Sequence, residues 1–234
     1  SLIIVVKWQI EAKNIFAIIL TMSIDRIYSE AGMFPSENSN FKLNPSKEEL
    51  QKAIIEAKSS SGNMIMEVGP GESLGVEVKK GDVYIGIEPY SRSKKLRDKV
   101  NRAHPQSKVF LVENNYTLPD FEPSLVLSVA PNPNDIENGM LYDYESFLKK
   151  SKAIVIALDT RTVEANTGSG VRGLVKKIKS DFREMGIRDF HAVRHFGTNL
   201  SGLMDDLGME DYRCSLESSA DIGNEAVIIY SSRF

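Results

Sequence analysis

The hydrophobic positions from residue 63 onward fall into two alternating patterns. Short continuous apolar runs predict strands that are buried on both faces, and apolar residues spaced three or four apart predict helices that pack by one side. Because the two patterns alternate, we expect a mostly parallel sheet with right-handed crossovers. The expected strands are 64–68, 83–88, 108–112, 124–130, 153–158, 189–194 and 225–230.

Helix boundaries are marked by end signals. Ser46 followed by Glu49 is a capping box, which predicts a helix that begins there and ends before Gly62. Gly186 is expected just after the end of another helix, where a left-handed residue commonly stands. Further helices are expected at about 91–104, 142–150 and 171–185.

The first 62 residues precede this alternation and are expected to form an N-terminal helical extension. Residues 1–30 read as one or two amphipathic helices, and residues 31–45 as a polar loop. The apolar run at 15–22 is too short to span a bilayer, so no membrane association is expected. The extension is expected to act as a lid over a site or as a homodimer contact.

Residues 63–234 are expected to form an α/β domain, a three-layer sandwich around a seven-stranded sheet. The chain has 234 residues, 41% of them hydrophobic, which is ordinary for a globular protein with a sizeable core. A net charge of −3 gives no overall basic field for nucleic acid. The single cysteine, Cys214, excludes an internal disulfide and fits the cytoplasm.

The segment around the first two strands carries the candidate chemistry. Gly69 and Gly71 follow the first strand and permit a tight turn with close backbone approach to a ligand. Glu88 ends the second strand, where a carboxylate can accept hydrogen bonds from both hydroxyls of a ribose. This layout predicts a nucleoside site at the carboxyl ends of the strands.

Two classes of cofactor use such a layout. Dinucleotide sites need the spacing G-x-G-x-x-G/A, whereas the third glycine here is Gly75, one residue late. Glu67 stands two residues before the first glycine, where its charge would repel a pyrophosphate. A ligand with a cationic amino-acid end would suit it better.

The segments EVGPGESLG and YIGIEP resemble motif I and the acidic loop of the class I S-adenosylmethionine-dependent methyltransferases. The resemblance implies S-adenosylmethionine as cofactor, S-adenosylhomocysteine as product, and a last strand that runs antiparallel. It places Glu67, Gly69, Pro70 and Gly71 at the methionine end of the cofactor, and Glu88 and Pro89 at the ribose. It places Asn114 and Asn115 at the adenine, and Ala130 beside the methyl group.

The methyl acceptor is not evident from the residues. The segment 131–134 (PNPN) loosely resembles the Asn/Asp-Pro-Pro-aromatic motif of amino-group methyltransferases, without its aromatic residue. It also weakly resembles a segment of tRNA guanine-N7 methyltransferases, but acidic residues follow where phosphate contacts would need Lys and Arg. A small-molecule acceptor is therefore slightly favoured, a rigid loop without a catalytic group stays open, and the catalytic base is unknown.

Polar residues outside the nucleoside site offer few further candidates for chemistry. His191 and His195 are four residues apart, but no third ligand stands nearby and a metal site is not expected. Asp159 and Arg161 end the fifth strand at the same edge as the nucleoside site, and residues 164–172 form a glycine-rich connector. The alternatives are an NAD-binding oxidoreductase and a non-catalytic binding protein on a methyltransferase fold.

Overall fold

The computed structural model describes residues 41–70, 75–76, 78–88, 108–113, 115, 118–196 and 225–232. The chain divides into two compact units, Ser1–Ser39 and Asn40–Phe234, and every described residue lies in the second. The segment expected to act as a lid or a dimer contact lies largely in the first unit, outside the described residues. Both roles therefore stay predictions.

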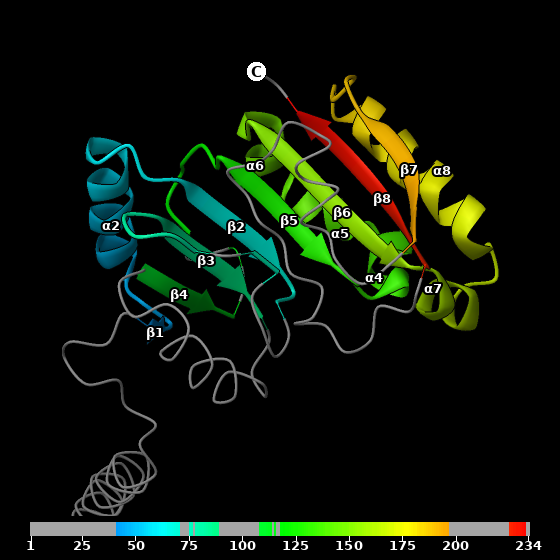
Figure 1. Ribbon diagram of the computed structural model, residues 1–234, viewed down its shortest axis with the longest axis horizontal. Coiled ribbons are helices and arrows are strands. Elements are labelled where there is room, and N and C mark those ends of the chain that lie inside the picture. The colour runs from blue at the N-terminus through cyan, green and yellow to red at the C-terminus, as the bar shows by residue number, and fades with distance from the viewer. Residues whose placement is uncertain are drawn as a thin grey trace, which may run out of the picture. The chain divides into compact units, whose positions relative to one another are not determined.

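A single sheet of eight strands, in the order β1-β4-β3-β2-β5-β6-β8-β7, runs through this unit (Figure 1). All neighbouring strands are parallel except β8, which is antiparallel to both β6 and β7. This confirms the mostly parallel α/β sheet and the antiparallel last strand. The strands are β1 (Phe41–Leu43), β2 (Met64–Val68), β3 (Val83–Ile87), β4 (Lys108–Val112), β5 (Leu125–Val129), β6 (Ala153–Asp159), β7 (His191–Phe196) and β8 (Glu225–Ser232).

Strand β1 corrects the sequence analysis in two respects. Its residues fall in the expected loop 31–45, and they raise the strand count from seven to eight. The strand forms because Phe41, which is fully buried, and its neighbours pair in parallel with β4. Residues 41–59, assigned by sequence to the N-terminal extension, thus belong to the same unit as the sheet.

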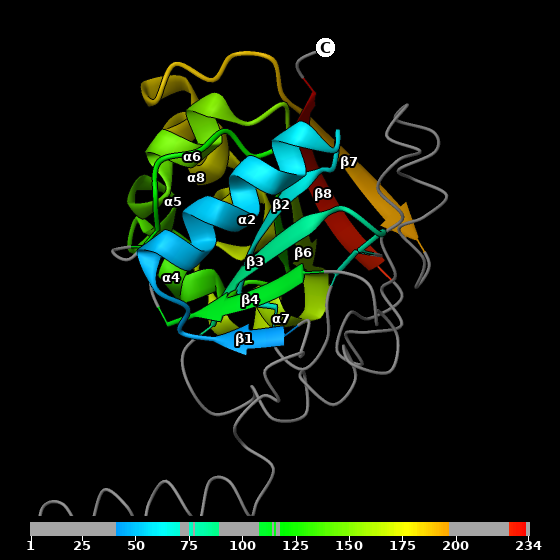
Figure 2. The same cartoon turned by 90° about the vertical axis from the view of Figure 1, so that its left-hand side faces the viewer.

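The described helices all pack on one face of the sheet (Figure 2). The capping box of α2 is present, with Ser46 as N-cap, and Gly186 follows α8 with a φ of 81°. Helices α4 and α7 were not expected. Helix α4 begins within the segment 131–134, and α7 directly follows β6. The helices are α2 (Lys47–Ser59), α4 (Pro133–Glu137), α5 (Met140–Asp143), α6 (Glu145–Lys150), α7 (Thr160–Asn166) and α8 (Gly170–Glu184).

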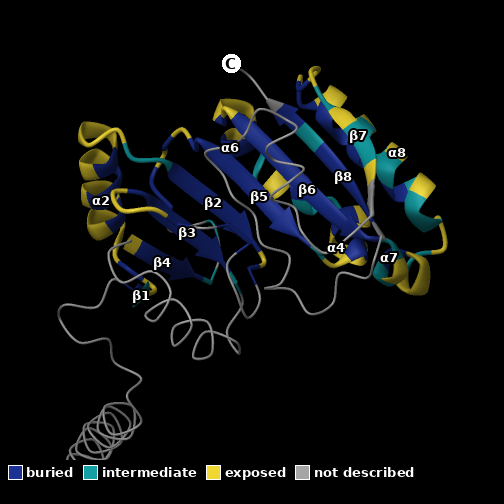
Figure 3. Cartoon of the chain, viewed as in Figure 1, coloured by how far each residue is buried: buried dark blue, intermediate teal, exposed yellow. Residues whose placement is uncertain are grey.

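Strand residues alternate between two hydrophobic clusters, one on each face of the sheet, and the central strands β2, β3, β5 and β6 are buried throughout (Figure 3). On β2, Met66 and Val68 face the helices, whereas Ile65 belongs to the cluster on the other face. Val76 and Val78, from the β2–β3 connection, join this second cluster. The helix expected at 91–104 lies outside the described residues.

The structure describes the connection from β2 to β3 in part. Parallel neighbours are normally joined through a helix. The described residues of this connection, 75–76 and 78–82, form a bend, an isolated bridge and a turn. None of the described helices combines the length and the apolar content that crossing a membrane requires.

Candidate functional site

The chain reverses its direction of travel across the sheet at β2. Strands β3 and β4 follow on one side of β2, and β5 then returns to the other side. The regular pairing of β2 with β5 reaches Glu67 and Leu127, and beyond it the Ser128 hydroxyl donates to the Val68 carbonyl at 3.0 Å. Ligands of open α/β sheets bind in the crevice at such a switch point.

Gly69 begins the turn at the mouth of this crevice. Its φ of 73° lies in the left-handed region, which favours glycine, and a Cβ added there would meet nothing within 4 Å. Its N–H donates to the Ile87 carbonyl at 2.9 Å, which holds the start of the turn against β3. Backbone at Gly69 is therefore exposed, fixed and open to close approach by a ligand.

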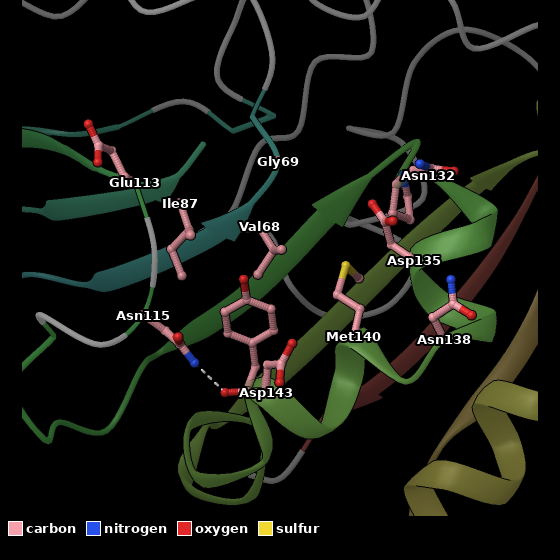
Figure 4. Close-up of a pocket in the computed structure, with 12 residues that line it drawn as sticks. Val68, Gly69, Ile87, Glu113, Asn115, Asn132, Asp135, Asn138, Met140 and Asp143 are labelled. Carbon is pink, nitrogen blue, oxygen red and sulfur yellow. Dashed lines mark hydrogen bonds between the residues drawn. The ribbon is translucent and has the colours of Figure 1, made fainter. Parts of the chain in front are cut away.

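A cavity of about 420 Å³ lies beside Gly69, on the helix-covered face of the sheet. Strand ends form one wall and the segment from Pro131 to Tyr144 forms the other, as Figure 4 shows. The volume is within the usual range for small-molecule sites. The lining residues are Val68, Gly69, Ile87, Glu113, Asn115, Pro131, Asn132, Asp135, Asn138, Met140, Asp143 and Tyr144.

The polar lining of the cavity is acidic and amide in character. Three carboxylates and three carboxamides line it, and among the residues that the structure describes no Lys, Arg or His does. The Asn115 side chain donates to the Asp143 carbonyl and thus ties the end of β4 to α5. The Asn44 amide donates to Glu113 at 2.9 Å. Such a lining offers many acceptors to a ligand but no fixed positive charge to a phosphate.

Glu67 lies on the opposite face of the sheet from the cavity. Its side chain is 1% exposed, and its Oε2 accepts hydrogen bonds from the Tyr84 hydroxyl at 2.5 Å and the Gly75 N–H at 2.9 Å. Burial raises the pKa of Glu67 to about 7, against the opposing effect of these two bonds. Burial and the neighbouring Glu67 also raise the pKa of Tyr84. An influence of Glu67 on a ligand would pass through the backbone of the turn.

Gly75 owes its place to Glu67 rather than to a dinucleotide pattern. A Cβ at this position would stand 2.7 Å from Oε1 of Glu67 and 2.7 Å from the Leu127 side chain. Glycine is therefore needed for the turn to approach the carboxylate. The glycine that comes late for the dinucleotide spacing has a packing role here.

Glu88 and Pro70 lie near the buried side chains of Glu67 and Tyr84. The Glu88 backbone N–H donates to the Val112 carbonyl at 2.9 Å, and the charge of its half-buried side chain contributes to the raised pKa values of Glu67 and Tyr84. Pro70 is buried and packs over Gly86 of β3. The structure thus brings the start of the turn and the end of β3 together, as the sequence predicted for a nucleoside site.

The end of β5 has an unusual backbone. Ala130 has a φ of 46°, in the left-handed region that is strained for a residue with a Cβ, although its N–H donates to the Ala157 carbonyl. A rigid loop at 131–134, which the sequence left open as one interpretation, is wrong in part, because α4 begins at Pro133. Asn132 caps this helix by accepting from the Asn134 N–H at 3.1 Å. A cap followed by proline is a helix start that the sequence analysis missed.

Asp159 and His191 do not line the cavity. Asp159 is buried and caps α7 through the Thr162 N–H at 2.6 Å, so its role is structural. His191 is exposed and its ring packs against that of Tyr230. Gly71, Pro89 and Asn114 lie outside the described residues. Neither Tyr84 nor the cavity wall formed by α4 and α5 was evident from the sequence.

Comparisons with known proteins find similarity only at the level of solved structures, since no protein-family model and no curated protein sequence matches the chain. The chain resembles an O-methyltransferase from Bacillus cereus in complex with S-adenosylhomocysteine (12% identity, 91% of this chain and 90% of that one, TM-score 0.42). It also resembles the O-methyltransferase TomG from Streptomyces achromogenes in complex with S-adenosylmethionine (14%, 81% and 82%, 0.43).

A third similar structure is a putative RNA methyltransferase from Pyrococcus horikoshii (12% identity, 80% of this chain and 84% of that one, TM-score 0.41). Two of these proteins are named for transfer to oxygen, and the third is named for RNA. All three TM-scores are below 0.5, so a function has to come from the geometry of the chain's own residues.

Proposed function

We propose that the chain binds S-adenosylmethionine in the crevice between β2 and β5 and transfers its methyl group to a small-molecule acceptor. The observation that carries this proposal is the open, left-handed backbone at Gly69 beside a cavity whose described lining contains no basic residue. The first feature permits close approach of a ligand, and the second favours a nucleoside cofactor without phosphates.

The charge of the described cavity lining favours this cofactor over NAD. NAD carries a pyrophosphate, whose negative charge a dinucleotide site has to accommodate. The carboxylates of Glu113, Asp135 and Asp143 would repel it.

The described residues fit the nucleoside of the proposed cofactor. Val68, Ile87 and Met140 offer apolar surface for an adenine ring, and Asn115 and Asp143 offer hydrogen-bonding groups at its rim. The Glu88 carboxylate, at the end of β3, would accept from the ribose hydroxyls. Gly69 would face the methionine end through its backbone. Gly71, Pro89 and Asn114 keep their sequence-based assignments to this site.

When bound, S-adenosylmethionine supplies a methyl group on a positively charged sulfur. The chain's residues then need mainly to bind, orient and exclude water, because the reaction is a direct displacement that proximity accelerates. The strained backbone at Ala130 is typical of functional sites, and it directly precedes Pro131 and Asn132, which line the cavity where an acceptor would meet the methyl group. No described side chain is assigned as a base.

The acidic lining and the net charge of −3 favour a small molecule over the phosphate-rich acceptor that the weak tRNA guanine-N7 resemblance would imply. A non-catalytic role on the same fold makes a distinct prediction. It predicts either no binding of the cofactor, or binding without transfer to any acceptor in a broad screen with methyl-labelled donor.

Calorimetric titration with S-adenosylhomocysteine and, separately, with NAD tests the proposal. Binding of the first and not of the second is the expected result. An Asn115→Ala variant should bind S-adenosylhomocysteine more weakly, and Asn166→Ala, on the exposed side of α7, is the matched control. Binding of NAD alone would replace the proposal by the oxidoreductase alternative.

A further inference from the structure

The buried pair of Tyr84 and Glu67 joins β3 to the far end of the glycine turn. The phenol is fully buried and donates to Glu67 at 2.5 Å, and the same carboxylate oxygen accepts from the Gly75 N–H. A buried phenol and carboxylate are costly unless they are paired. A short bond of this kind to an ionised carboxylate is among the stronger hydrogen bonds in proteins.

The turn is thus anchored at two points. Gly69 is held by the Ile87 carbonyl at the start, and Gly75 is held by Glu67 at the end. The tight contact between Gly75 and Oε1 of Glu67 leaves no space for another side chain at position 75. The position of the second anchor therefore depends on one carboxylate, and the position of that carboxylate depends on Tyr84.

We propose that Glu67 and Tyr84 are a positioning pair, which holds the glycine turn in its donor-binding conformation when Glu67 is ionised and makes donor affinity depend on its proton. This inference rests on the proposed function of the crevice. In this arrangement neither Glu67 nor Tyr84 touches the cofactor, and both act through the backbone of the turn.

Hydrogen-bond chemistry and charge support the dependence on the proton. The ionised carboxylate accepts both bonds with full charge assistance, whereas a protonated one accepts them more weakly and needs an acceptor for its own O–H. Among the described residues, the titratable groups that act on Glu67 are Tyr84 on β3 and Glu88 just beyond it. Burial brings the pKa of Glu67 to about 7, so both forms are populated near neutral pH.

The test is the pH profile of S-adenosylhomocysteine affinity between about pH 5.5 and 8.5, measured by calorimetry. For the wild type, affinity should fall about tenfold towards low pH, the worth of a hydrogen bond to a charged group, with a midpoint near the Glu67 pKa of about 7. Glu67→Gln should bind weakly and without this pH dependence. Tyr84→Phe should shift the midpoint to higher pH, because the lost bond favours the ionised form.

The chain contains a matched control for Tyr84→Phe. Tyr142 donates to Glu184 at 2.7 Å on the surface and does not line the cavity. Tyr142→Phe removes a similar bond and should keep the wild-type profile. Thermal unfolding of each variant shows whether it is folded, and if Glu67→Gln does not fold, the shift in Tyr84→Phe decides the test.

Two negative results have different meanings. If the wild type binds S-adenosylhomocysteine with a flat pH profile, and Glu67→Gln or Tyr84→Phe matches it, the positioning pair is wrong and the proposed function stands. If the wild type binds no S-adenosylhomocysteine at any pH, the proposed function itself is wrong.

Discussion

Pro70 packs directly over Gly86, so that a Cβ on Gly86 would stand 3.0 Å from the proline ring and 2.5 Å from the Leu111 side chain. The glycine turn after β2 therefore rests on a bare stretch of β3. The contact links the conformation of the turn to the neighbouring strand, at the point where the proposed cofactor site begins.

The first prediction concerns this contact. Gly86→Ala should lower the free energy of unfolding by about 1–3 kcal/mol, the usual cost of overpacking, and should weaken S-adenosylhomocysteine binding because the turn is displaced. Urea unfolding and calorimetry measure the two effects. Gly168→Ala is the control, since a Cβ there meets nothing within 4 Å. Unchanged stability and binding in Gly86→Ala would show that the turn does not depend on this contact.

The second prediction concerns stability and pH. The folded-state pKa of Glu67 is about 7, above its ordinary value of 4.5, so the folded protein binds this proton more tightly than the unfolded chain does. Its stabilising contribution is complete below pH 4.5 and is lost as the pH rises to about 7. The loss is on the order of 3 kcal/mol.

Glu67→Gln removes this titration, and other carboxylates affect both proteins alike. The difference in unfolding free energy between the wild type and Glu67→Gln should therefore move in favour of the variant as the pH rises from 4.5 to about 7. Urea unfolding at several pH values measures it. Two parallel stability curves would mean that the buried carboxylate keeps an ordinary pKa.

The third prediction concerns the strained end of β5. Ala130→Gly should raise the free energy of unfolding by roughly 0.5–1 kcal/mol, because the relief of left-handed strain exceeds the entropy that glycine loses on folding. Ala192→Gly, in the extended backbone of β7, should lower it by a similar amount. Equal destabilisation of both variants in urea unfolding would exclude strain at Ala130.

The fourth prediction concerns the ribose. Glu88→Ala should weaken S-adenosylhomocysteine binding by about 1.5–3 kcal/mol, the worth of hydrogen bonds to a charged group. The wild type should bind the 2′-deoxy analogue less tightly than the parent compound, whereas Glu88→Ala should bind the two alike. Glu122→Ala, at an exposed position before β5, is the control. Undiminished affinity in Glu88→Ala would place the ribose elsewhere.

The fold was largely predictable because its strands are buried on both faces. The continuous apolar runs of β2 and β4 gave their bounds without error, and the capping box gave the start of α2. Strand β1 was missed because three residues carry no pattern of their own, and its pairing with β4 is a long-range contact. Helices α4 and α7 were missed because they are short and begin at cap residues that also occur in turns.

The sequence indicates a location for the candidate site but not the residues that surround it. Glycines and a terminal carboxylate are local signals, and they indicated the carboxyl ends of β2 and β3. The partner of Glu67 is Tyr84, which lies on another strand, so only the register of the sheet reveals the pair. The acidic wall of the cavity comes from α4 and α5, and nothing local ties Asp135 or Asp143 to Gly69.

A crystal structure of the full chain grown with S-adenosylhomocysteine tests the central claim most directly. We expect the adenine ring between Ile87 and Met140, the ribose hydroxyls at Glu88, and the methionine end along the backbone at Gly69. Electron density for the ligand at any other place, or a crevice filled by the chain's own side chains, would contradict the account.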